Sequence, residues 1–281
     1  LGGLAAKWAR APKLLWAVHS PDTDRRYTKR RTLLIARTCA ALSGTLPDHI
    51  VYASEETKDN HHLIGYTRKY SSIIPGGYDL GDFAPDAEAG ARVRAEFAIP
   101  ADAPVVGIVA RFNSQKGYPY FFEMAKLLRE RVPNIHFIAA GRGVEKANTD
   151  IMNWAADARV TGCLSLLGAR TDVPAVLNAL DVLVSPSLGE AGPLIVGEAL
   201  AAGVPSVGTK VGLTHLLIGD PQFVTQPLDS ASMADAVEKI LRLTPAQRKQ
   251  IGLQSRQRIL DNFSIARTAN GYAQLYEDLM A

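Results

Sequence analysis

The chain has 281 residues, of which 47% are apolar and 21% are charged. This length and composition predict a sizeable buried core in one or two globular domains, and they exclude a disordered or fibrous protein. The net charge of +3 and the isoelectric point near 8.8 are too weakly basic to predict nucleic-acid binding.

One local run, "DRRYTKRRT", places five basic residues within seven positions, 25–31. Such a run could face anionic headgroups or an acidic substrate, although a solvated surface is the simpler interpretation. No apolar run reaches the ~18 residues that cross a bilayer, and we expect no signal peptide. Two cysteines, Cys39 and Cys163, lie in different halves of the chain. Reduced thiols are therefore expected, which favours a reducing, cytoplasmic compartment.

The chain begins with "LGGLAAKWARAP", which looks like the end of a helix, so we expect it to start inside a longer protein. Short apolar runs then alternate with longer helical patterns, which is typical of βαβ units and a mostly parallel sheet. Helices are expected at 118–132, at 172–180 and over about the last 50 residues. Strands are expected at 14–20, 49–54, 71–75, 105–110, 135–141, 164–168, 181–187, 205–209 and 222–227.

A stretch rich in Gly, Pro and Asp, residues 75–90, is typical of a connector. Three expected strands precede it and six follow it. The sequence thus predicts an α/β protein with a partial N-terminal Rossmann-like domain over 1–75 and a complete, doubly wound one over 76–265. A C-terminal helix over 266–281 is expected to return to the N-terminal domain.

Polar residues directly after strands matter most, because open parallel sheets bind ligands beyond the carboxyl ends of their strands. Arg111 follows one such strand, and Lys116 precedes the next helix, so a phosphate site could form where both cations meet the helix amides. His19 follows the first strand and could project into the same kind of crevice. For each of these residues a purely structural or surface role is the alternative.

A second candidate is the segment "LGEAGPLIVGEALAAG", residues 188–203, which carries two acids eight positions apart, Glu190 and Glu198. Pro193 suits a first helical position, and the amides of Gly192 and Leu194 would lie at the helix start. We expect Glu198 to be partly buried and therefore to need a partner, because an unpaired buried charge costs several kcal/mol. A protein cation and a ligand hydroxyl are both possible partners.

Two other patterns are interpreted as decoys. Gly141 and Gly143 follow a strand, but Lys146 stands where the NAD fingerprint requires a third glycine. Asp22 and Asp24 form a D-x-D pair, which arises easily by chance and is not expected to bind a metal. No His/Cys cluster has zinc spacing.

The sequence is similar to the retaining glycosyltransferases of the family-4 type, the bacterial glycosyl transferases group 1, which have the GT-B fold of two Rossmann-like domains. The resemblance covers roughly residues 70–281, and its most specific element is the spacing of Glu190 and Glu198 within a strand, loop and helix. The other motifs are "IIPGGYDLGDFAPD", "VARFNSQKG", "FIAAGRG", "LLGARTDVPAVLNALDVLVSPS", "LAAGVPSV" and "NFSIARTANGYAQLYEDL".

The resemblance implies a role for each acid: Glu198 would hold the ribose hydroxyls of a nucleotide sugar, and Glu190 would lie beside the donor sugar. Arg111 and Lys116 match the basic pair that binds the diphosphate, and His19 loosely matches a histidine that reaches the reacting centre. Transfer of the sugar to an acceptor hydroxyl with retention of configuration follows, with no metal and no cofactor. The leaving phosphate is thought to accept the acceptor's proton.

The donor would be a UDP-, GDP- or ADP-linked sugar, and Arg170 is the first candidate for base contacts. The acceptor would be a saccharide or a lipid-linked molecule in cell-surface polysaccharide or lipopolysaccharide synthesis, with possible contact with the inner membrane face. The sequence departs from the family at Ala110, where glycine is usual, and at 213–215. Compared with the family, we expect the first half of the N-terminal domain to be missing, and if nothing precedes this chain we expect donor binding without efficient transfer.

Three other functions remain as alternatives. A sugar-nucleotide epimerase shares the GT-B fold, but it would need acid/base carboxylates at the reacting carbons. A non-catalytic nucleotide-sugar-binding module would result if the chain lacks half of the cleft. A glycosidase would need both acids about 5–9 Å apart at the scissile bond, and Glu198 lies too far into a helix to suit that role.

Overall fold

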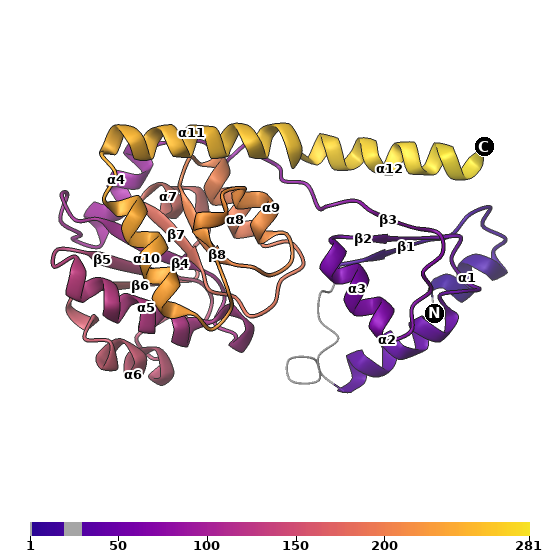
Figure 1. Ribbon diagram of the computed structural model, residues 1–281, viewed down its shortest axis with the longest axis horizontal. Coiled ribbons are helices and arrows are strands. Elements are labelled where there is room, and N and C mark those ends of the chain that lie inside the picture. Colours follow the sequence, from indigo (N-terminus) through magenta and orange to yellow (C-terminus); the bar gives the residue numbers. More distant parts are fainter. Residues whose placement is uncertain (1, 20–29) are drawn as a thin grey trace. The chain divides into compact units, whose positions relative to one another are not determined.

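The computed structural model describes residues 2–19 and 30–281 and divides into two compact units (Figure 1). Unit 1 comprises Leu1–Gly77, Gly189–Gly192 and Phe263–Ala281, and unit 2 comprises Tyr78–Leu188 and Pro193–Asn262. The sequence predicts domains over 1–75, 76–265 and 266–281. The binding roles expected for these domains stay predictions.

Unit 2 contains a six-stranded sheet in which all neighbouring strands are parallel. The strand order is β6-β5-β4-β7-β8-β9, so the order reverses between β4 and β7. All six strands expected in this half of the chain are present. They are β4 Val105–Val109, β5 His136–Ala140, β6 Leu164–Gly168, β7 Val182–Ser185, β8 Ser206–Thr209 and β9 Val224–Thr225.

Helices cover both faces of this sheet: α5, α6 and α10 lie on one face, and α4, α7, α8 and α11 lie on the other (Figure 1). The helices of unit 2 are α4 Ala87–Glu96, α5 Tyr118–Arg131, α6 Thr149–Asp157, α7 Val173–Asn178, α8 Leu194–Ala201, α9 Thr214–Ile218, α10 Ser230–Leu241 and α11 Pro245–Asn262. Three short 3-10 turns are η1 Ser114–Lys116, η2 Thr161–Cys163 and η3 Pro221–Phe223.

Short polar side chains set where several of these helices begin. Asp86 accepts a hydrogen bond from the Ala89 amide, and Asn148 and Asp229 cap α6 and α10 in the same way. Each cap satisfies a backbone donor that has no partner inside the helix. The local sequence therefore determines these starting points.

A half-buried ion pair fixes the sheet to the surrounding helices. The Asp181 carboxylate accepts hydrogen bonds from the Val105 amide at 2.8 Å and from the Arg94 guanidinium at 3.0 Å. Arg94 also donates to the Ala179 carbonyl. These bonds join α4, the start of β4 and the start of β7, so they hold the two strands that flank the reversal of strand order.

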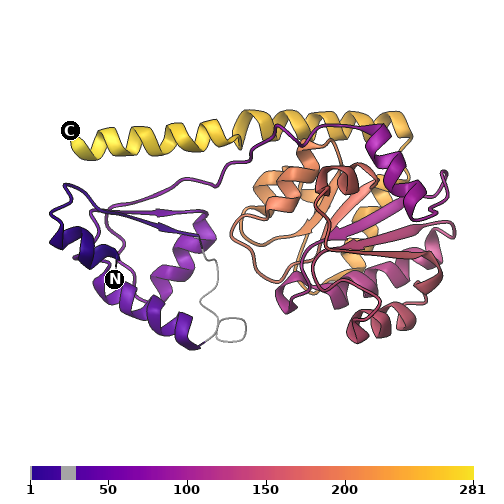
Figure 2. The same cartoon turned by 180° about the vertical axis from the view of Figure 1, so that it is seen from behind.

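Unit 1 contains a three-stranded parallel sheet in the order β1-β2-β3, and this sheet matches the three strands expected before residue 76. Its core includes Ile50, Tyr52 and Tyr66, with Trp16 packed against them. Figure 2 shows the same elements from behind. The elements are β1 Leu15–Val18, β2 His49–Tyr52, β3 Ser71–Ile73, α1 Gly2–Trp8, α2 Arg30–Leu42, α3 Glu55–Leu63 and α12 Ile265–Met280.

Helix α12 packs beside the chain that follows β3. The Thr268 hydroxyl donates to the Pro75 carbonyl at 2.9 Å, and Gly271 lies next to the Ile74 side chain. A side chain at Gly77 would overlap the backbone of Ile265. The close approach of α12 therefore requires glycine at position 77.

Two adjacent histidines on α3 predict that unit 1 loses stability in acid. Burial is the largest cause that lowers the pKa of both His61 and His62, and His61 Nδ1 donates to the Thr57 carbonyl at 2.7 Å. Because the folded-state pKa lies below the ordinary value of 6.5, the neutral rings stabilise the fold above that pH, and the stability falls as protons bind. Calorimetry should show a lower melting temperature at pH 5 than at pH 7.5.

The matched variant is His61→Gln, which keeps a polar side chain without a titrating ring. We expect its melting temperature to fall less between pH 7.5 and pH 5 than that of the wild type. An equal fall in both proteins would show that this imidazole does not control the acid sensitivity.

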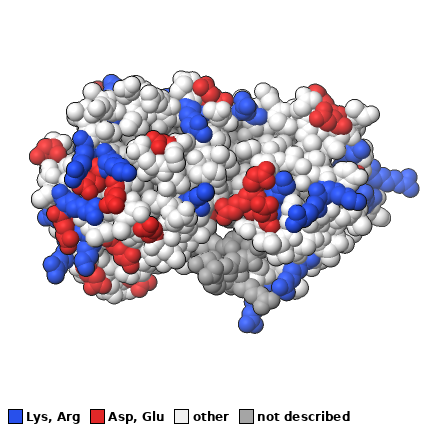
Figure 3. Space-filling model, in the orientation of Figure 1, with Lys and Arg blue, Asp and Glu red and all other residues white. Residues whose placement is uncertain are grey.

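Neither the surface charge nor the cysteines of the described residues point to a particular function. On the face shown in Figure 3, acidic and basic side chains are intermixed. Cys39 and Cys163 are half-buried and are not disulfide-bonded. Within residues 2–19 and 30–281, no helix is long and apolar enough to cross a membrane.

Candidate active site

The carboxyl ends of the parallel strands of unit 2 meet at one edge of the sheet, where the strand order places β4 beside β7. Arg111 is the second residue after the end of β4, and the segment that leads to α8 follows the end of β7. Crevices at such a reversal of strand order are the usual ligand sites of open α/β sheets. The predicted donor-binding residues of unit 2 therefore originate at the edge where a ligand is expected.

The loop after β4 is held directly against the loop after β7. The Leu188 amide donates to the Gln115 carbonyl at 2.7 Å, and a side chain at Gly117 would overlap the Pro186 carbonyl. Gly117 has a left-handed φ of 68° and forms the N-cap of α5. Lys116 is therefore held at the start of α5, next to the chain that leads to α8.

The two predicted diphosphate ligands differ in their surroundings. Arg111 is exposed, and no carboxylate of the described residues pairs with its guanidinium. Lys116 is half-buried and takes part in interactions within the protein. The amides at the start of α5 add partial positive charge beside Lys116. This arrangement suits an anion such as a diphosphate.

The loops after β5 and β6 support Arg111 from the other side. The Gly141 amide donates to the Gly168 carbonyl at 2.7 Å, and a side chain at Gly141 would overlap the Ala110 carbonyl. The Tyr118 hydroxyl donates to the same Ala110 carbonyl at 2.5 Å, and burial raises the pKa of Tyr118. Gly141 is thus a close-packing glycine rather than part of a dinucleotide fingerprint.

Sequence reasoning did not identify Gly117, Gly141 and Tyr118 as support for the site. The role of the two glycines could have been predicted, because each stands in a loop that follows a strand, where close approach of two backbones is common. Tyr118 carried none, since an aromatic residue at a helix start is typical of a core position.

Helix α8 begins one residue later than expected. Pro193 is its N-cap rather than its first helical residue, with φ of −71° and ψ of 99°. The Pro193 carbonyl accepts a hydrogen bond from the Val196 amide at 3.1 Å, as an N-cap carbonyl does. Proline fits this position because the nitrogen of an N-cap residue needs no partner inside the helix. Leu194, the first residue of the helix, is 60% exposed although it is apolar. An exposed leucine at this edge is available to contact a ligand.

Glu198 is half-buried in α8, as the sequence predicts. Burial raises the pKa of its carboxyl group above the ordinary value of 4.5. Among the described residues, no cation pairs with this carboxylate and no donor forms a hydrogen bond to it. The sequence left two possible partners for Glu198, a protein cation and a ligand hydroxyl. No such cation occurs among the described residues, so the ligand hydroxyl remains as the expected partner.

Arg170 is already engaged by two carboxylates. Its guanidinium donates to Asp172 at 2.8 and 2.7 Å and to Glu96 at 2.6 and 3.0 Å. It also lies 5.9 Å from the centre of the Phe97 ring. These contacts join α4 to the loop after β6, so they give Arg170 a structural function, and its contact with a base stays a prediction.

The remaining predicted residues belong to unit 1 or lie outside the described residues. His19 is exposed directly after β1, and Glu190 and Gly192 lie in the 189–192 segment of unit 1. Their roles stay predictions. Asp22, Asp24 and the basic residues of 25–29 lie outside the described residues, whereas Arg30 and Arg31 are exposed at the start of α2. No group of residues suited to a metal ion occurs in the described part of the chain.

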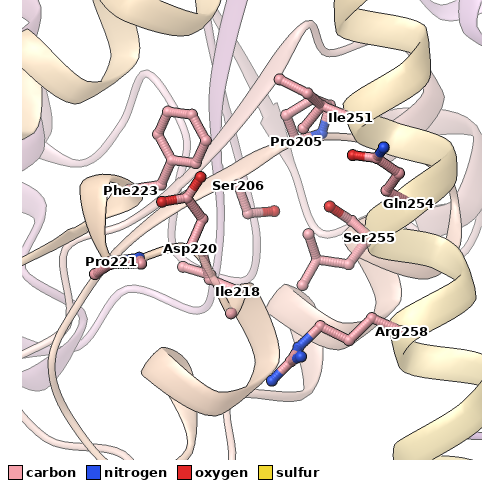
Figure 4. A pocket seen from close by; sticks show the side chains of 12 residues that line it. Pro205, Ser206, Ile218, Asp220, Pro221, Phe223, Ile251, Gln254, Ser255 and Arg258 are labelled. Carbon is pink, nitrogen blue, oxygen red and sulfur yellow. The ribbon is translucent and has the colours of Figure 1, made fainter.

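A cavity of about 390 Å³ lies in unit 2 away from these residues (Figure 4). Its walls come from the start of β8, the end of α9 and α11, and include Ser206, Asp220 and Ser255. Arg258 lines it too, but its guanidinium donates twice to the Leu216 carbonyl at 3.0 and 2.8 Å. Because Ser206 begins β8, this cavity lies at the amino end of that strand, opposite to the edge that carries Arg111.

The chain matches known proteins in sequence. The profile of a family described as "Glycosyl transferases group 1" matches residues 103–242, which include β4 to β9 and the segment from Arg111 to Glu198. UDP-Gal:alpha-D-GlcNAc-diphosphoundecaprenol alpha-1,3-galactosyltransferase of Escherichia coli is 27% identical over 285 residues, covering 100% of this chain and 73% of that protein. Lipopolysaccharide core biosynthesis mannosyltransferase LpsB of Rhizobium meliloti is 29% identical, covering 75% of this chain and 61% of that protein.

The chain spans only 36% to 47% of several other relatives, among them putative glycosyltransferase EpsF of Bacillus subtilis. Among solved structures, Anabaena HepE in complex with UDP superposes with a TM-score of 0.86 at 18% identity, covering 99% of this chain and 75% of that one. This likeness confirms the expected GT-B fold with two Rossmann-like sheets.

Proposed function

The chain belongs to the group 1 glycosyl transferases, and from this membership we propose that it transfers a sugar from a nucleoside-diphosphate donor to an acceptor hydroxyl with retention of configuration. The observation that carries the proposal is the Glu198 carboxylate, which is half-buried without a protein partner among the described residues. A ribose diol would supply two hydroxyl donors to it. Each charge-assisted bond of this kind contributes roughly 1.5–3 kcal/mol.

The rest of the edge suits the remainder of such a donor. Arg111 and Lys116, with the amides at the start of α5, would hold the diphosphate and stabilise the negative charge that grows on it as the bond to the sugar breaks. Gly192, Pro193 and Leu194 would bring the backbone at the start of α8 close to the donor. In this proposal Glu190 lies beside the donor sugar and His19 reaches the reacting centre.

No step needs a metal ion, because cationic side chains and helix amides supply the positive charge. The leaving phosphate oxygen accepts the proton of the attacking hydroxyl on the same face of the sugar, so the old bond breaks and the new bond forms on one side. Retention of the anomeric configuration follows from that geometry.

The relatives favour a surface glycan as the product. One relative is a galactosyltransferase whose name specifies a UDP-linked donor and a diphosphoundecaprenol acceptor, and another is a lipopolysaccharide core mannosyltransferase. We therefore propose a saccharide or lipid-linked acceptor in polysaccharide or lipopolysaccharide synthesis, at the inner face of the membrane. UDP is the first donor nucleotide to test.

Ligand-observed NMR with UDP, GDP, ADP and NAD tests the proposal. We expect one nucleoside diphosphate to bind the wild type, Glu198→Ala to lose that binding, and NAD not to bind. The matched control is Glu130→Ala, which removes an exposed carboxylate from α5 of the same unit and should bind like the wild type. Equal binding by wild type and Glu198→Ala would reject the donor site.

A further inference from the structure

The residue through which the chain enters unit 2, Tyr78, contacts the beginning of α8 at two points. Its side chain is only 4% exposed. Its hydroxyl donates to the Pro193 carbonyl at 3.3 Å, and its ring lies directly over Gly197. The two contacts bracket the first turn of the helix that carries Glu198.

Gly197 makes room for the tyrosine ring. A methyl group at this position would overlap ring carbons of Tyr78, so alanine or any larger residue would displace either the ring or the helix. Glycine costs a helix roughly 0.5–1 kcal/mol relative to alanine. A glycine inside an eight-residue helix whose other residues, apart from Glu198, are apolar is therefore explained by the contact with the ring.

The contact also bears on the neighbouring carboxylate. Glu198 directly follows Gly197, so a shift or rotation of the backbone at 197 changes where the Glu198 side chain points. The Pro193 carbonyl accepts both the Tyr78 hydroxyl and the Val196 amide, which holds the N-cap in place. A carboxylate that meets a ribose diol must be placed within a few tenths of an ångström, and rigid neighbours provide that placement.

We propose that Tyr78 is a positioning residue for the donor site: with Gly197, it fixes the start of α8 and thereby orients Glu198 toward the nucleotide. This inference rests on the proposed function, because it assumes that Glu198 binds the donor. Tyr78 touches no ligand in this role. It acts through the backbone of residues 193 and 197.

Binding of UDP to this chain tests the inference, measured by titration calorimetry at a temperature where circular dichroism shows each variant fully folded. We expect Gly197→Ala to weaken UDP binding about tenfold or more. Tyr78→Phe keeps the ring and should stay within about threefold of the wild type. The double variant Tyr78→Leu with Gly197→Ala removes the overlap but also the support of the ring, so its affinity should stay as low as that of Tyr78→Leu.

A purely structural role would lower the melting temperature without changing the UDP affinity of the folded protein, so wild-type affinity in a folded Gly197→Ala variant would overturn the inference. If that variant does not fold, Tyr78→Leu carries the same test, because it removes the support of the ring without creating an overlap. Gly162→Ala is the matched control, since nothing lies within 4 Å of that position. Glu198→Ala, run beside them, separates the two hypotheses: if it loses UDP while Gly197→Ala does not, only the positioning role fails.

Discussion

Replacing Glu198 with glutamine should make the free protein more stable and its nucleotide binding weaker. Burial raises the pKa of this carboxyl group, which means that the fold disfavours the charged form. A group of this kind stabilises the fold at low pH, and that contribution is lost as the pH rises through its folded-state pKa. At neutral pH the ionised side chain is therefore a cost that glutamine removes while keeping nearly the same shape.

The expected gain appears as a higher melting temperature, at about 2–4 °C per kcal/mol for a domain of this size. The expected loss is a weaker affinity for the nucleoside diphosphate by about 5–30-fold, because neutral hydrogen bonds replace charge-assisted ones. Calorimetric unfolding and titration with UDP measure the two effects. In the wild type the affinity should also fall as the pH is lowered through a range above 4.5, and this dependence should be absent in Glu198→Gln.

The control for this experiment is Glu130→Gln, in which an exposed carboxylate is neutralised. It should change neither the melting temperature nor the affinity appreciably. A Glu198→Gln protein that melts lower than the wild type would show that the carboxylate is already well stabilised inside the free protein. The assignment of Glu198 to a ligand would then lose its physical basis.

Replacing Gly117 with alanine should cause the largest loss of stability among single methyl additions near the site. The left-handed φ of 68° disfavours any residue with a side chain by roughly 1–2 kcal/mol. The added methyl group would also overlap the Pro186 carbonyl, and forced overpacking costs roughly 1–3 kcal/mol more. We expect the free energy of unfolding to fall by about 2–5 kcal/mol, measured by urea denaturation.

This substitution should also weaken nucleotide binding, because relief of the overlap separates the loop of Lys116 from the loop that leads to α8. Gly162→Ala adds the same group where no atom lies within 4 Å, and we expect little change there in stability or binding. An unchanged midpoint of denaturation in Gly117→Ala would show that the two loops are not packed as described.

Local sequence patterns were sufficient for the elements of the fold. All nine expected strands occur, because short runs of β-branched and aliphatic residues bounded by turn residues favour strands. Asp and Asn caps mark several helix starts, since the capping side chain and the amide it satisfies lie within three residues of each other. The position of Pro193 was wrong by one residue, because N-cap and first helical position both tolerate a missing amide hydrogen.

The composition of the site was also readable from the sequence. Glu190 and Glu198 are conspicuous because acids are rare within an apolar strand, loop and helix. Arg111 and Lys116 are conspicuous because they follow a strand. The expectation that Glu198 is partly buried was confirmed, since the apolar residues that surround it in the helix determine which face packs inward.

The sequence by itself thus determined which segments become strands and helices and which polar residues stand at their ends, because periodicity and capping act over a few neighbouring residues. Only the tertiary structure decided the strand order and the lack of a partner for Glu198 among the described residues. It also decided the ion pair between Arg170 and Glu96, which stand 74 positions apart, and the packing of the Tyr78 ring on Gly197. These features depend on contacts between segments far apart in the chain. Such contacts arise from shape and burial in the assembled core, which no local pattern of residues encodes.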